Sequence, residues 1–113
     1  MSRADRLERL DSERLLLEVE YQAFLVAALR EVAGGSWGLF GHNQDKHASA
    51  KWNQTITQLC DQGAEIDQMR ETLGIGPFAL HQEFEASRGP VASNAPGEPK
   101  QAKAWLERMD QSL

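Results

Sequence analysis

One glycine-rich segment divides the first two thirds of this chain. Residues 34–43 read GGSWGLFGHN, with four glycines in ten positions. Glycine costs a helix about 1 kcal/mol relative to alanine, so this density of glycine opposes a continuous helix. On either side, apolar residues recur at helical spacing. The segment therefore predicts the corner of a long antiparallel helical hairpin, and the chain as a whole predicts an all-α fold.

Residues 4–33 form the strongest helical pattern. One face carries Leu7, Leu10, Leu17, Tyr21, Phe24, Leu25, Ala28, Leu29 and Val32. Leu15, Val19 and Val26 widen this face, so that from about residue 15 more than half of the helix circumference is apolar. A helix buried this widely needs more than one neighbour. We expect either the shorter helices to wrap around it or two hairpins to self-associate.

Three polar residues interrupt this apolar stripe. Asp11, Arg14 and Glu18 stand at positions i, i+3 and i+7, so Arg14 can pair with both acids. One interpretation is an exposed helix end with surface ion pairs, which stabilise little. The other is a polar layer in a coiled-coil seam, where such residues set the register and the oligomeric state.

The glycine-rich corner also contains Trp37, Leu39 and Phe40. These side chains are too apolar for a fully solvated loop, so we expect them to cover the end of the hairpin core. The alternative is an exposed apolar tip that binds a partner or touches a membrane.

A second helix is predicted over residues 45–73, and a third over residues 77–87. The second has one sharp apolar face: Ala48, Trp52, Ile56, Leu59, Ile66, Met69 and Leu73. Gly63 lies on that face, which predicts close approach by a neighbouring helix. The turn Leu73–Pro77 separates the two helices, with Gly74 as a helix cap and Pro77 suited to a first turn.

The C-terminal part of the chain begins with a linker. Residues 89–99 contain three prolines and two glycines, which exclude regular structure. A short amphipathic helix follows, with Ala102, Trp105, Leu106 and Met109 on one face. Such a helix is marginal alone in water. We expect it to dock on its own bundle or to bind a protein partner, with Trp105 as the anchor. The predicted organisation is 1–88, linker 89–99 and helix 100–113.

The residues that bear catalytic or metal chemistry are few. A single cysteine, Cys60, cannot form an internal disulfide, which favours the reducing cytoplasm. His42 and His47 are five residues apart and His81 lies on another helix, whereas zinc sites use closely spaced sets of ligands. Nothing in the sequence places Cys60 beside a histidine to form a nucleophile and base. We therefore expect no metal, no cofactor and no enzymatic activity.

The charge of the chain disfavours a general DNA-binding role. The net charge is −5, spread as about −2, −2 and −1 over residues 1–35, 36–76 and 77–113, whereas nucleic-acid binding needs a basic surface. Residues 66–84 do have the order of elements of a helix-turn-helix: a helix, a Leu-Gly-Ile turn and a second helix. However, Arg70 stands where a small residue is usual, and the second helix carries Glu83 and Glu85. The longest apolar run has seven residues, too few to span a membrane.

These observations favour a non-enzymatic helical interaction or adaptor protein that self-associates and uses its C-terminal helix for a protein partner. The layout also resembles that of small terminase subunits from phage-like packaging systems. In those proteins a long helical hairpin assembles into a ring, and a C-terminal segment contacts the motor subunit. The resemblance concerns the order of helices. It implies, as the alternative, an accessory role in DNA packaging.

Overall fold

The structure is a computed structural model that describes residues 2–34, 46–87 and 99–109, with the backbone alone for residues 46–53 and 99. It confirms the all-α class. The described residues form four helices: α1 (Arg3–Ala33), α2 (Lys46–Thr72), α3 (Ala79–Ala86) and α4 (Pro99–Arg108). In this part of the chain no helix combines the length and apolarity needed to cross a membrane.

The first helix begins at a capping box. The Ser2 hydroxyl accepts a hydrogen bond from the Asp5 N–H at 3.2 Å, and the Asp5 carboxylate accepts from the Ser2 N–H at 3.3 Å. Two N–H groups that a helix start leaves without partners are thus satisfied. At the other end, Gly34 donates its N–H to the Arg30 carbonyl at 3.0 Å. The predicted bounds of this helix are correct to within one residue.

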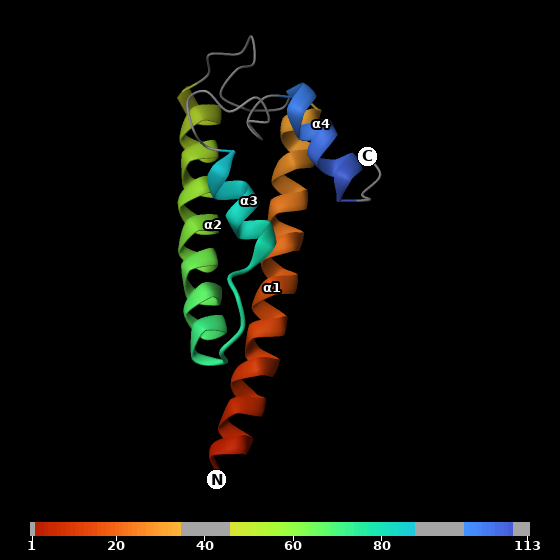
Figure 1. The fold of residues 1–113 in the computed structure, drawn as a ribbon. Coiled ribbons are helices and arrows are strands. Elements are labelled where there is room, and N and C mark those ends of the chain that lie inside the picture. The colour runs from red at the N-terminus through yellow and green to blue at the C-terminus, as the bar shows by residue number, and fades with distance from the viewer. Residues whose placement is uncertain (1, 35–45, 88–98, 110–113) are drawn as a thin grey trace.

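The long helices α1 and α2 run in opposite directions and pack against each other, as Figure 1 shows. The N-terminal end of α1 projects beyond the end of α2. The short helix α3 lies against the same pair, and α4 lies beside the C-terminal half of α1. Helix α1 is therefore the element on which both α2 and α4 pack.

A single hydrophobic core joins all four helices. Its fully buried side chains are Tyr21, Leu25, Leu29 and Val32 from α1, Leu59 and Ile66 from α2, Phe84 from α3, and Ala102, Trp105 and Leu106 from α4. The predicted need of α1 for more than one neighbour is thus met within one chain along its C-terminal half.

Helix α4 is docked through the residues that the sequence assigned to a partner. Ala102 and Trp105 are fully buried and Leu106 is 1% exposed, while Met109 packs half-buried against the same core. The Arg108 guanidinium lies 4.8 Å from the centre of the Trp105 ring and also pairs with Glu83 of α3. The sequence left open whether this helix docks on its own bundle or on a protein partner. In the structure it docks on its own bundle.

The connection between α2 and α3 differs from the predicted one in one respect. Gly74 has a φ of 74°, the left-handed conformation expected of a glycine that ends a helix. The third helix, however, starts at Ala79 and not at Pro77. Phe78 stays extended because its N–H donates to the Asp67 carboxylate at 2.8 Å, which ties the connection back to α2. Trp37, Leu39 and Phe40 of the predicted corner lie outside the described residues.

Replacing the core tryptophan tests the docking of α4. Trp105→Ala should lower the free energy of unfolding by about 3–5 kcal/mol, the usual cost of removing a large buried aromatic side chain. Urea denaturation followed by circular dichroism measures this change. Lys103→Ala, at an exposed position of the same helix, is the matched control. A loss below about 1 kcal/mol for Trp105→Ala would contradict the docked position.

Candidate functional site

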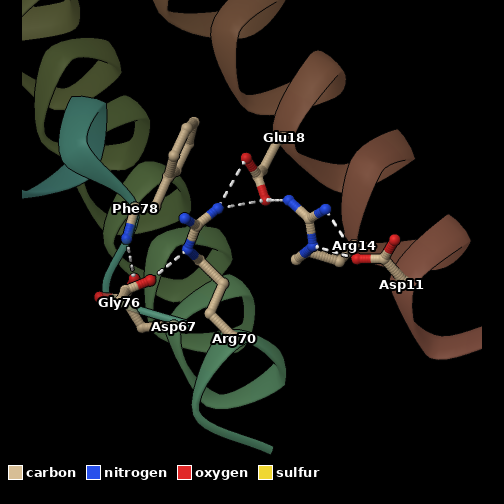
Figure 2. Close-up of polar contacts among 7 residues, drawn as sticks. All are labelled: Asp11, Arg14, Glu18, Asp67, Arg70, Gly76 and Phe78. Carbon is tan, nitrogen blue, oxygen red and sulfur yellow. Dashed lines mark hydrogen bonds and ion pairs between the residues drawn. The ribbon is translucent and has the colours of Figure 1, made fainter. Parts of the chain in front are cut away.

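A chain of ion pairs links α1 to α2 near the end of the hairpin. Arg14 donates from Nε and Nη2 to Asp11 Oδ1, at 2.9 and 2.7 Å, and its Nη1 pairs with Glu18. From α2, Arg70 Nη1 donates to both oxygens of the same Glu18 carboxylate, at 3.1 and 2.9 Å. Figure 2 shows Glu18 held between the two guanidinium groups.

This network is largely shielded from water. The side chains of Arg14, Glu18 and Arg70 are 11%, 15% and 19% exposed, and Asp11 is about half exposed. Hydrogen bonds to Asp11, then to Glu18, raise the pKa of Arg14 above its ordinary value, so it stays charged. Arg14 and Glu18 are thus more shielded from water than simple surface ion pairs. Their predicted part in oligomer register, with Asp11, stays a prediction.

The same network fixes the connection that follows α2. Arg70 Nε donates to the Gly76 carbonyl, and its guanidinium lies 6.0 Å from the centre of the Phe78 ring. An arginine is unusual at this position of a helix-turn-helix. Here the Arg70 side chain links the connection to Glu18, which gives the residue a structural reason. The connection spans residues 73–78, longer than the short turn of that motif. The second helix contributes Glu83 and Glu85, which oppose binding to phosphates.

A second polar cluster lies where α1, α2 and α3 meet. The Tyr21 hydroxyl and His81 Nδ1 share a hydrogen bond of 2.9 Å, and both side chains are buried. His81 Nε2 lies 3.5 Å from Glu85, and the Cys60 thiol donates to the same Glu85 oxygen at 3.2 Å. In the Nε2–H tautomer, His81 accepts from Tyr21 and directs its N–H toward Glu85.

The histidine ring stands directly on Gly63 of α2. A Cβ built on Gly63 would lie 2.3 Å from the ring of His81, far inside contact distance. The close approach predicted at Gly63 is therefore confirmed, and the neighbour is the side chain of His81. Sequence reasoning missed the cluster because its members come from three helices and carry no motif spacing.

Tyr21 and His81 are the buried members of this cluster, whereas the Glu85 side chain is 44% exposed. Burial, followed by electrostatic interactions with Cys60, Glu85 and Asp67, raises the pKa of Tyr21 well above its ordinary value and keeps the phenol protonated. The Cys60 thiol donates its hydrogen bond to the Glu85 carboxylate. Across the described residues, no group of three or more His, Cys, Asp or Glu side chains is placed to hold a metal ion. His42 and the side chain of His47 lie outside the described part.

The outer side of α1 carries an exposed apolar strip. Leu15, Leu16 and Val19 are 51%, 66% and 66% exposed. The sequence predicted that Leu15, Val19 and Val26 widen an apolar face that needs more than one neighbour. Within this chain Leu15 and Val19 are exposed. Val26 is buried. Helix α4 lies beside the C-terminal half of α1 and not beside its N-terminal half (Figure 1). We call Leu15, Leu16 and Val19 the α1 strip.

Comparison of this chain with protein-family models, with curated proteins and with solved structures finds no match. The geometry of the chain itself therefore carries the functional argument.

The contact between Gly63 and His81 gives a clear stability test. Gly63→Ala should lower the free energy of unfolding by about 1–3 kcal/mol, because the added methyl group overpacks the histidine ring. Thermal and urea denaturation measure the loss. Gly76→Ala is the control, since nothing lies within 4 Å of its Cβ position and no change above about 0.5 kcal/mol is expected. Adding His81→Ala to Gly63→Ala should recover part of the loss, and strict additivity of the two changes would count against the contact.

The carboxylate between the two arginines gives a second test. Glu18→Ala should cost about 1–3 kcal/mol of unfolding free energy, less than a fully buried pair because water reaches part of the network. Glu13→Ala, at an exposed position of the same helix, should change stability by less than about 0.5 kcal/mol. A double-mutant cycle with Arg70→Ala isolates the link between helices. A coupling energy near zero would show that Glu18 and Arg70 do not interact in solution.

Proposed function

We propose that this chain is a non-enzymatic helical interaction protein that binds a protein partner on the α1 strip. The observation that supports the proposal is the exposure of Leu15, Leu16 and Val19 within two turns of one helix. Single exposed apolar residues are common on soluble proteins and need no explanation. A contiguous group of large aliphatic side chains is the usual composition of a contact surface.

The position of the strip suits partner binding. It lies on the half of α1 that α4 does not cover, near the end that projects beyond α2 (Figure 1). Glu18 and Arg70 tie this part of α1 to α2, so the helix is already held in place before a partner arrives. A surface that is ordered in advance avoids part of the entropic cost of association.

A partner site at Trp105 itself has a weaker basis. The apolar face of α4, with Ala102, Trp105 and Leu106, is buried in the core. Presenting this face to another protein requires the helix to undock, and losing the burial of Trp105 alone costs on the order of 3–5 kcal/mol. The contact with a partner would have to offset that cost. The α1 strip is available without any such rearrangement.

Site-specific crosslinking tests the proposal. The photoreactive amino acid benzoylphenylalanine replaces Leu16 in one variant and Gln58, on the exposed side of α2, in a control variant. After illumination in an extract of the native host, the variant with the probe at position 16 should give a specific crosslinked protein. Adding Leu15→Gln and Val19→Gln should abolish this product, because these substitutions remove the apolar contact.

The mass of the product identifies what is bound. A product with the mass of two copies of this chain supports self-association, and a product with a different partner supports an adaptor role. If position 16 gives no product beyond that seen at position 58, the α1 strip is not an interaction surface and the proposal fails.

A further inference from the structure

His81 joins three helices at one buried point. Its ring, carried by α3, lies against Gly63 of α2 and meets the ring of Tyr21 of α1 edge to face, with the ring centres 5.5 Å apart. His81 is 5% exposed and Tyr21 is fully buried. Histidine is the side chain that ordinarily changes its charge between about pH 5 and pH 8. A buried histidine at such a junction can therefore make the packing of the helices depend on pH.

The neutral form of His81 satisfies the buried hydroxyl beside it. The Tyr21 oxygen lies 2.9 Å from Nδ1, and this is the hydrogen bond that the hydroxyl makes among the described residues. The raised pKa of Tyr21, caused first by burial, keeps the phenol protonated, so its O–H always needs an acceptor. Nδ1 can accept this hydrogen bond only while it carries no proton of its own.

Protonation of the imidazole removes this acceptor. The Nδ1–H then donates to the Tyr21 oxygen, and the Tyr21 O–H has to turn away from its hydrogen-bond partner in the described residues. A buried donor that is left without a partner costs more than an ordinary hydrogen bond contributes. The positive ring also gives up the water that surrounds it in the unfolded chain. Both effects disfavour the folded arrangement when His81 is charged.

The acidic groups around the ring offset little of this cost. Glu85, on α3 itself, lies 3.5 Å from Nε2, beyond the usual length of an N–H···O hydrogen bond. Its side chain is 44% exposed, so water screens its attraction for a positive ring. From α2, the Cys60 thiol donates to the same carboxylate, and Asp67 accepts from the Phe78 N–H. From α1, the titratable group that faces the ring is Tyr21.

We propose that His81 is a pH-sensitive latch, which holds α3 on the two long helices while its ring is neutral and releases α3 when its ring is protonated. The folded state favours the neutral ring. The stability that the latch contributes is therefore present at neutral pH and is lost as the pH falls through the range in which histidine takes up a proton. Release withdraws Phe84 from the core, because this fully buried side chain belongs to the same helix.

Urea denaturation of the full chain at about pH 7.5 and about pH 5.5, where an ordinary histidine changes its charge, tests the latch. Between these conditions the folding equilibrium constant of the unaltered chain should fall at least about fivefold more than that of His81→Gln, because a buried donor loses its partner. All other titrating groups are common to both chains. Tyr21→Phe should be less stable at neutral pH but less sensitive to acid, because Nδ1 then lacks a partner in either state.

Amide hydrogen exchange of the unaltered chain gives a readout that needs no variant. After correction for the intrinsic effect of pH, the Ser87 N–H, which bonds within the last turn of α3, should lose protection on acidification relative to the Leu25 N–H of α1.

Three results would overturn the latch. The first is an equal loss of stability on acidification in the unaltered chain and in His81→Gln. The second is a gain of stability by the unaltered chain relative to His81→Gln, which would show that attraction to Glu85 outweighs the lost acceptor. The third is protection of Ser87 that stays constant relative to Leu25, since α3 would then remain docked.

Discussion

The wide apolar surface of α1 is the constraint on which the rest of the structure depends. A helix with an apolar surface on more than one side cannot be covered by a single antiparallel neighbour. In this chain α2 packs on one side of α1 and α4 on another, and α3 supplies Phe84 and His81 to the junction. The short C-terminal helix is therefore part of the core.

The sequence predicts the helices well because helical periodicity and chain breakers are local signals. The spacing of apolar residues marks α1, and glycine and proline mark the ends of α2 and of the linker. Gly63 also predicts a close contact from its place on the apolar face. Its neighbour could not be predicted, because His81 is distant in the sequence and sits on a helix whose rotation the pattern leaves open.

The candidate site was harder to predict, since each of its features depends on which side of a helix a neighbour covers. Leu15 and Val19 have the same helical spacing as Val26, yet only Val26 is buried. Arg14 and Glu18 suggest a polar layer, but the bond between Glu18 and Arg70 crosses 52 positions in the sequence. A large aromatic residue such as Trp105 suits a partner-binding anchor and a core position equally well. Only the fold shows that Trp105 is in the core.

The polar network and the apolar strip are two sides of one segment of α1. Glu18 faces α2 and is held there by Arg70, while Leu15, Leu16 and Val19 stand on another side of the same turns. If Glu18 were released, this part of α1 would lose its tie to α2, and the strip would be carried on a less ordered helix end. Binding would then have to offset the cost of ordering that end. Under the proposed function, the ion-pair network contributes to recognition without touching a partner, because it holds the apolar surface in a fixed place.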